Sequence, residues 1–136
     1  MFGYDALIDY LRLLETQSGR IKLLETGSSE LGKPMYIAFI SSEKNIKELD
    51  HLREINRRLA LDSEIPHSDR EEMIAQGKVF VFATLSMHAN EVGPSQAAPL
   101  MAYDLITERD PGMGAQLENV VFMMNPSHNP DGMDMI

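Results

Sequence analysis

The chain has no cysteine and no long apolar run among its 136 residues. Without cysteine it can form neither a disulfide nor a thiolate metal site, so histidine, aspartate and glutamate are the candidate metal ligands that remain. No apolar run approaches the roughly 20 residues that a helix needs to cross a bilayer, so we expect no membrane span. The first residues, MFGYDALIDY, also lack the basic and apolar regions of a secretory signal.

Basic residues are scarce as well. The chain has 12 lysines and arginines against 21 aspartates and glutamates, which gives a formal net charge of −9. A protein that binds a phosphate backbone needs a basic surface, so this balance argues against a nucleic-acid partner. What is present is ordinary for a globular protein: 43% of the residues are hydrophobic, and the length suits a single domain. We therefore treat residues 1–136 as part of one domain.

The first half of the chain has the periodicity of helices separated by two strands. Over residues 4–15, apolar side chains recur every three or four positions, which predicts an amphipathic helix. Two short apolar runs, 21–26 and 35–40, are separated by GSSELGKP, which predicts a β-hairpin or two neighbouring strands. A second amphipathic helix is predicted over residues 45–61, and a short helix with Ser68 as its N-cap follows it.

In the second half, apolar strands alternate with helical patterns. Residues 79–85, VFVFATL, predict a buried strand, and residues 120–124 predict another. Between them, Pro94 is suited to the first turn of a helix, and residues 108–116 have the composition of a loop. Helices that alternate with apolar strands indicate an α/β fold, here a mixed sheet with crossover helices on both faces. The buried face of the helix after Pro94 is predicted to consist of Ala97, Ala98, Leu100, Met101, Leu105 and Ile106.

His88 and Glu91 are the leading candidates for a functional site. They lie in a short polar segment directly after the predicted strand 79–85 and before a helix. In sheets with parallel strands, ligands bind beyond the carboxyl ends of the strands. A histidine and a carboxylate three residues apart at such a place can bind one metal ion. The alternative is a polar connection in which Glu91 only favours the N-terminus of the nearby helix.

The same H-x-x-E spacing occurs at His51 and Glu54, inside the amphipathic helix predicted over residues 45–61. There we interpret it as part of a solvated helix face. His128 and Asp131 form H-x-x-D in the segment NPSHNPDG, whose Asn-Pro and Asp-Gly pairs are typical of turns, so we favour a structural role for both.

Two other kinds of site are not supported by the sequence. Nucleophilic serine catalysis is disfavoured because the chain has no G-x-S-x-G motif. The segment GSSELGK resembles a phosphate-binding loop, but Pro34 follows it in place of the serine or threonine that would bind magnesium. We therefore reject a nucleotide-binding site.

Several of these segments occur in the order found in one enzyme family. A G-x-S-x-x-G-[KR] turn, the H-x-x-E segment and an N-P-D-G turn follow one another, and the chain resembles the N-terminal part of a zinc carboxypeptidase of the carboxypeptidase A-like family. The resemblance covers essentially the whole chain. The matching residues are Gly27, Ser29, Gly32 and Lys33 for the first motif, His88 and Glu91 for the second, and Asn129, Pro130, Asp131 and Gly132 for the third.

The resemblance implies a zinc-dependent metallocarboxypeptidase that hydrolyses peptide bonds at the C-terminus of peptides, with a phosphorylase/hydrolase-like zinc peptidase architecture. One zinc ion would be bound by His88, Glu91 and a second histidine from beyond Ile136, and its open position would hold a water. In the family, a later glutamate acts as general base, and later arginine and asparagine residues bind the substrate. No catalytic or substrate-binding residue is therefore assigned within residues 1–136.

The resemblance carries further expectations. The chain is expected to be a truncated piece of the catalytic domain, inactive alone, and able to self-associate through exposed apolar surface. An extracytoplasmic location is favoured. Two alternatives stay open: a zinc amidohydrolase of the aspartoacylase type, and a non-catalytic relative that binds peptides. The G-x-S-x-x-G-K and N-P-D-G turns favour the peptidase over the amidohydrolase.

Overall fold

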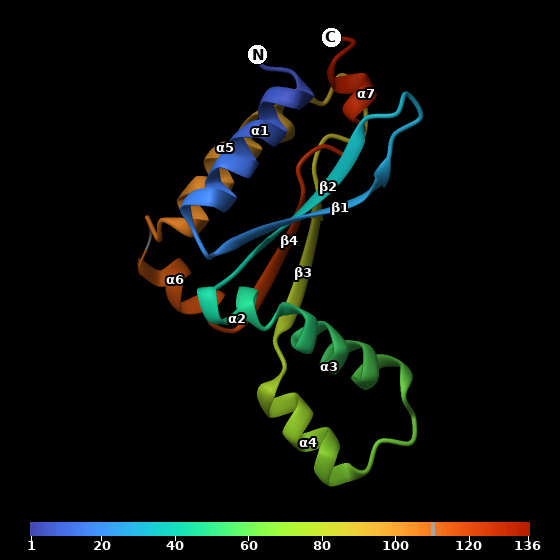
Figure 1. Cartoon of the computed structure of the whole chain (residues 1–136), viewed down its shortest axis with the longest axis vertical. Helices are drawn as coiled ribbons and strands as arrows, with labels where there is room; N and C mark the ends of the chain where they lie inside the picture. The colour runs from blue at the N-terminus through green and yellow to red at the C-terminus, as the bar shows by residue number, and fades with distance from the viewer. Residues whose placement is uncertain (110) are drawn as a thin grey trace.

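A computed structural model, which describes residues 1–109 and 111–136, contains among them one four-stranded mixed sheet flanked by helices (Figure 1). This arrangement confirms the predicted α/β class. The strands are β1 (Ile21–Ser28), β2 (Pro34–Ile40), β3 (Val79–Thr84) and β4 (Val120–Asn125). The helices are α1 (Tyr4–Gln17), α2 (Glu43–Lys47), α3 (Leu49–Leu61), α4 (His67–Gln76), α5 (Val92–Ile106), α6 (Pro111–Leu117) and α7 (Pro130–Met133).

The strand order is β1-β2-β4-β3, so the last strand in the sequence lies inside the sheet. β1 and β2 form the predicted antiparallel hairpin, and β2 also pairs antiparallel with β4. β3 and β4 are parallel, and α5 and α6 lie in the crossover between them. Because Thr84 pairs with Asn125 at the end of both strands, the segments that follow β3 and β4 start side by side.

Helices α1 and α5 lie next to each other and cover one face of the sheet (Figure 1). The predicted amphipathic pattern of α1 is confirmed, since its apolar stripe is buried. This stripe packs against small and apolar residues of α5 and against the side chains that β2 and β4 point toward it. The residues of this core include Tyr4, Leu7, Ile8, Leu11 and Leu14 of α1, Ala98, Ala102 and Ile106 of α5, and Ala38, Ile40 and Met124 of the sheet.

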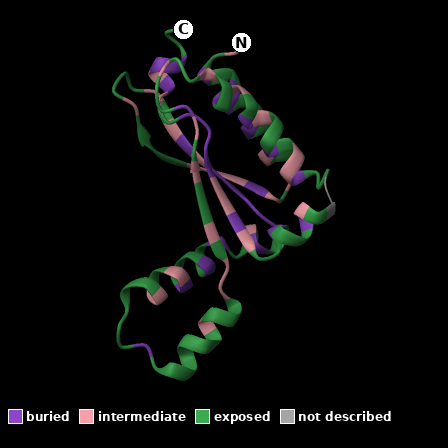
Figure 2. Ribbon diagram, turned by 180° about the vertical axis from the view of Figure 1, so that it is seen from behind, coloured by how far each residue is buried: buried purple, intermediate pink, exposed green. Residues whose placement is uncertain are grey.

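The opposite face of the sheet is covered only at one end. There Leu49 and Leu52, from the start of α3, pack against Phe39 and Val121. Beyond this contact, α3 and α4 extend away from the sheet as a pair (Figures 1 and 2). The described part of α4 has no buried residue, in keeping with its exposed colour in Figure 2.

The helix predicted over residues 45–61 is wrong in one respect, because the structure divides it into α2 and α3 at Glu48. The division has a physical cause in Asn45, which is buried. Its side-chain NH₂ donates to Ser41 Oγ at 3.0 Å and to the Leu117 carbonyl at 3.1 Å. These hydrogen bonds of Asn45 set the direction of α2. The chain turns at Glu48, and α3 then begins with the buried residue Leu49.

Two further local predictions are corrected. Ser68 is not an N-cap, because α4 already begins at His67 after Pro66, and the Ser68 hydroxyl contacts the Asp69 carboxylate at 3.1 Å. The segment predicted as a loop, 108–116, contains most of α6, in which buried Leu117 supplies the apolar contact with the sheet. Asp110, within the same predicted loop, lies outside the described residues.

The predicted burial of β3 is also wrong. Its location and length are as expected, but Phe82 is 54% exposed and Val79 and Val81 are exposed as well. The reason is position: among the described strands, β3 is at the edge of the sheet and pairs only with β4. An apolar edge strand of this kind is a surface for association, so self-association stays a prediction.

Candidate metal centre

Three turns meet at one end of the sheet, and each carries one of the sequence motifs. The hairpin turn (residues 29–33) joins β1 to β2, the link (residues 85–91) follows β3, and the segment 126–132 follows β4. The parallel pairing of β3 and β4 and the antiparallel pairing of β2 and β4 place all three at the same end (Figure 1). The link and the segment after β4 are hydrogen bonded, since Leu85 N–H donates to the Asn125 carbonyl at 3.0 Å and His128 N–H donates to the Leu85 carbonyl at 2.7 Å.

Ser86 sets the path of the link. Its φ angle of 51° lies in the left-handed region, which residues other than glycine rarely adopt. The Ser86 hydroxyl donates to the Glu91 carbonyl and accepts the Ser95 N–H at 3.0 Å, so it joins both ends of the link to the first turn of α5. Sequence reasoning missed Ser86, because a single serine after a strand carries no distinguishing pattern.

The structure brings His88 and Glu91 together at the exposed side of the link. His88 Nδ1 lies 2.9 Å from Glu91 Oε1, and the His88 backbone N–H donates to Glu91 Oε2 at 3.0 Å. The side chains are 67% and 49% exposed, so an ion from solvent can reach both. An imidazole nitrogen and a carboxylate oxygen side by side are suitable donors for zinc. The pair would supply two of the ligands that such an ion needs.

A third protein ligand is not found near this pair. Within residues 1–109 and 111–136 there is no group of three histidine, aspartate or glutamate side chains placed to bind one metal ion. His128 therefore does not complete the site with His88 and Glu91. The donor chemistry of the pair fits zinc, and the coordination shell requires at least one more protein group.

The contact with His88 lowers the pKa of Glu91, first through the hydrogen bond from the imidazole and second through the backbone N–H. Because the folded-state pKa is depressed, the contact adds stability above the ordinary glutamate pKa of about 4.3. That contribution is lost as the pH falls through the lowered value. We expect a ¹³C NMR titration of the Glu91 carboxyl to give a midpoint below that of an unperturbed glutamate.

In the His88→Ala variant the Glu91 midpoint should rise only part of the way, because the backbone N–H at position 88 is retained. His51→Ala is the matched control, and the Glu54 midpoint should not change in it, since Arg57 is the cause of the lowered pKa of Glu54. An unchanged Glu91 midpoint in His88→Ala would refute the assignment of the imidazole hydrogen bond.

The second H-x-x-E pair is a solvated helix face, as predicted. Arg57 donates to both oxygens of Glu54, from Nε and Nη2, each at 2.7 Å. His51 is exposed on the same helix, α3. Equal spacing in the sequence thus gives two different environments, and only the pair that follows a strand has its donor atoms in contact.

The structural role favoured for the H-x-x-D segment agrees with its contacts. The Asp131 carboxylate accepts hydrogen bonds from Ser29 Oγ at 2.7 Å and from Leu31 N–H at 3.1 Å. His128 is exposed, and its Nδ1 lies 3.4 Å from Asn125 Nδ2. Asp131 therefore joins the N-P-D-G turn to the G-x-S-x-x-G-K turn.

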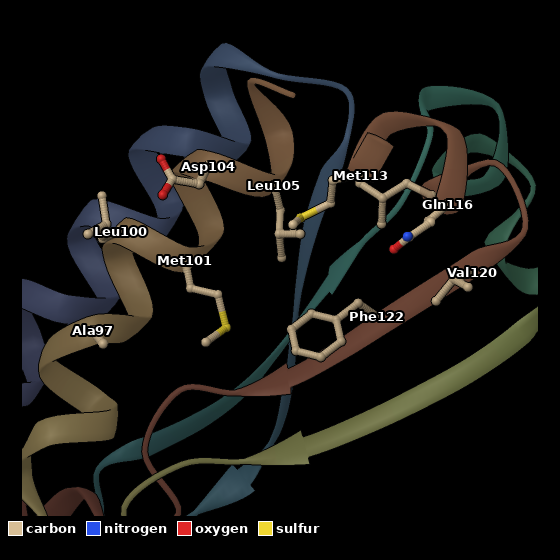
Figure 3. A pocket seen from close by; sticks show the side chains of 10 residues that line it. Ala97, Leu100, Met101, Asp104, Leu105, Met113, Gln116, Val120 and Phe122 are labelled. Carbon is tan, nitrogen blue, oxygen red and sulfur yellow. The ribbon is translucent and has the colours of Figure 1, made fainter. Parts of the chain in front are cut away.

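A separate apolar groove of about 510 Å³ lies between α5, α6 and β4, away from the His88–Glu91 pair (Figure 3). Its walls include Leu100, Met101, Met113 and Phe122, with Asp104 and Gln116 as polar members. This groove corrects the predicted buried face of α5. Leu100 is 58% exposed because it lines the groove, and the stripe that packs against α1 and the sheet consists of Ser95, Ala98, Ala102 and Ile106.

None of the described helices is long and apolar enough to cross a membrane.

Comparison with known proteins gives one family. The family model described as zinc carboxypeptidase matches residues 7–136 of the chain. The comparison of this chain with curated protein sequences found no match.

Two solved structures have a similar fold. A protein described as a carboxypeptidase A from Shewanella denitrificans OS-217 matches with a TM-score of 0.64 and 16% identity, over 95% of this chain and 26% of its own. Thrombin activatable fibrinolysis inhibitor matches with a TM-score of 0.61 and 14% identity, over 98% of this chain and 26% of its own. The chain thus spans about a quarter of the length of these two structures.

Proposed function

Because the chain belongs to the zinc carboxypeptidase family, we propose that residues 1–136 form the N-terminal portion of a single catalytic domain that hydrolyses C-terminal peptide bonds of peptides. The observation that carries this proposal is the contact between His88 Nδ1 and Glu91 Oε1, 2.9 Å apart beyond the end of a parallel strand. The family and the G-x-S-x-x-G-K and N-P-D-G turns favour the peptidase over an amidohydrolase of the aspartoacylase type.

His88 and Glu91 would hold one zinc ion, together with a histidine from a part of the domain outside these residues. Bound zinc would polarise the scissile carbonyl and lower the pKa of a bound water. The chain's own residues prepare the ligands: the His88 N–H orients the Glu91 carboxylate, and Ser86 holds the ends of the link. Zinc would replace the hydrogen bond between His88 Nδ1 and Glu91 Oε1. Because protons compete with a metal ion for its ligands, zinc affinity should fall in acid.

The remaining functional groups of the proposal also lie outside residues 1–136. They are a glutamate that acts as general base and the arginine and asparagine residues that bind the substrate carboxylate. Peptides are the proposed substrates, and an extracytoplasmic compartment is the proposed location, both on the basis of the family resemblance.

The proposal is tested on a protein that carries the whole domain, with two peptides of the same sequence, one with a free C-terminal carboxylate and one amidated. We expect mass spectrometry to show release of the C-terminal residue from the free peptide alone. A zinc chelator should stop the release, and added zinc should restore it. Binding of the peptide without cleavage would support a non-catalytic relative, and cleavage of acylated amino acids alone would support the amidohydrolase. Either outcome would contradict the proposal.

A further inference from the structure

The N-P-D-G turn approaches the link closely at a single glycine. A Cβ atom at Gly132 would lie 2.6 Å from Asn129 Nδ2 and 2.9 Å from the Cβ of Ala89, and both distances are shorter than Cβ atoms show in proteins. Ala89 stands between His88 and Glu91 in the sequence. Gly132 is buried, and its backbone does not have a positive φ angle. The glycine is therefore required by two neighbours, the Asn129 side chain and the link at Ala89, and not by backbone conformation.

Helix α7 is itself held in place by hydrogen bonds. The Asn129 side chain accepts the Gly132 N–H at 2.9 Å and so caps this single turn. On the other side, the Asp131 carboxylate accepts from Ser29 Oγ and from Leu31 N–H in the hairpin turn. Ser29 Oγ in turn accepts the Lys33 N–H at 2.9 Å, so the hairpin turn has its own internal support. The contact at Ala89 is thus made by an anchored turn.

The anchoring continues into the start of α1. The Asp134 carboxylate, just after α7, accepts the Tyr4 N–H at 2.7 Å and lies 2.6 Å from Lys33 Nζ. The Tyr4 hydroxyl donates to the Pro34 carbonyl at 2.8 Å. The hairpin turn, α7 and the N-terminus of α1 therefore form one hydrogen-bonded unit at the end of the sheet where the link lies.

We propose that α7, anchored to the hairpin turn through Asp131, is a positioning element that holds the link at Ala89 and so fixes the relative placement of His88 and Glu91. Ser86 holds the link from the side of α5, and Gly132 holds it from the side of α7. Ligand side chains have to be placed within about 0.5 Å for tight metal binding, and exposed loops do not achieve this without support. The inference rests on the proposed metal-binding role of His88 and Glu91.

The central experiment uses the 136-residue chain and the variant Gly132→Ala, with Gly93→Ala as the matched control. Gly93 is nearer in sequence to Glu91, but a Cβ atom there would meet no atom within 4 Å. We expect Gly132→Ala to shift the ¹H–¹⁵N NMR cross-peaks of residues 88–91 in the metal-free protein. In a protein that carries the whole domain, a titration with Zn²⁺ should show about tenfold weaker binding to the variant, the size of effect typical of residues that orient metal ligands. Gly93→Ala should change neither result.

A second substitution separates positioning from simple loss of structure. Ala89→Gly removes one of the two groups that a new Cβ at position 132 would meet, and the Asn129 side chain is the other. Gly132→Ala combined with Ala89→Gly should therefore recover part of the cross-peak positions and of the zinc affinity. Asn129→Ala removes the cap of α7 without adding any atom near Ala89. If Asn129→Ala reproduced the effect of Gly132→Ala and Ala89→Gly gave no recovery, the cap would be responsible and the proposal would be overturned.

The anchor is tested by Asp131→Ala, which removes the hydrogen bonds to the hairpin turn and leaves Gly132 unchanged. This variant should also weaken Zn²⁺ binding, and Ala89→Gly should not restore it, because no clash is present. If Gly132→Ala does not fold, Asp131→Ala becomes the variant that tests whether α7 positions the link. Unshifted cross-peaks at residues 88–91 in Asp131→Ala would overturn the positioning role.

Failure of the proposed function would have a different signature. If a protein that carries the whole domain showed no saturable change at His88 and Glu91 with Zn²⁺, the metal site would be refuted. The cross-peaks of the metal-free variants would still decide whether α7 fixes the link.

Discussion

We expect His88→Ala to weaken zinc binding about a hundredfold in a protein that carries the whole domain, which should otherwise purify with about one zinc ion per chain. The substitution removes the only imidazole that contacts Glu91 among the described residues. Structural zinc sites with four protein ligands bind with about 10 to 16 kcal/mol, so one ligand accounts for roughly 3 kcal/mol, or about a hundredfold in affinity. The measurement is the zinc content of protein purified without chelator.

His51→Ala provides the control for this result. It removes a histidine with the same H-x-x-E spacing, but Glu54 is engaged by Arg57 and α3 extends away from the link. Zinc content should therefore be that of the wild-type protein. Equal zinc loss in both variants would show that the choice between the two motifs is wrong, and no zinc in wild-type protein even after addition of metal would refute the enzyme proposal.

The second large effect concerns stability. Leu11→Ala should lower the free energy of unfolding by about 2 to 5 kcal/mol, because the Leu11 side chain is 0% exposed in the core between α1, α5 and the sheet. Urea denaturation of the chain, followed by circular dichroism, measures the change. A loss of this size is a large part of the stability of an ordinary domain.

Leu13→Ala is the matched control, since it makes the same change two residues away on the same helix. Leu13 is 53% exposed, so its replacement should change the free energy of unfolding by no more than about 0.5 kcal/mol. Similar losses at positions 11 and 13 would mean that α1 does not pack against the sheet through the face described here.

Elements whose sequence pattern has one physical cause were predicted well. The stripe of α1 repeats every three to four residues because one face is buried, and the structure buries those residues. The β1–β2 hairpin follows from two apolar runs around a turn, with positive φ angles at Gly32 in the turn and at Gly27 by the register shift in β1. In both cases the cause lies within a few neighbouring residues, so the sequence alone contains it.

Burial of β3 and of Leu100 could not be predicted, because apolar character shows only that a residue can be buried. Whether it is buried depends on a partner elsewhere in the chain. Phe82 lies on an edge strand and Leu100 lines the groove beside α6, and neither arrangement leaves a local pattern. The break at Glu48 is of the same kind, since it follows from the contact of Asn45 with Leu117, 72 residues away.

In the candidate site too, local features could be predicted from the sequence and contacts between distant segments could not. His88 and Glu91 could be predicted as candidate metal ligands from the sequence because their spacing and their place after a strand are local features. The supporting contacts were not found, since Ser29 and Asp131 are 102 residues apart and the approach of Gly132 to Ala89 also joins distant segments. The positioning role that we propose for the G-x-S-x-x-G-K and N-P-D-G turns depends on the fold, which brings them beside the H-x-x-E segment.

The place of β4 in the sheet has a consequence for synthesis of the protein. A chain that grows from its N-terminus can pair β1 with β2 early, because these strands adjoin in sequence. The edge of β2 that faces β4 and the edge of β3 that faces β4 both have to wait for β4, which follows them in the chain. While a ribosome is translating the α5–α6 crossover, the nascent chain therefore exposes two unpaired apolar edges. That interval is when a chaperone that binds extended apolar segments would have the most effect on the yield of folded protein.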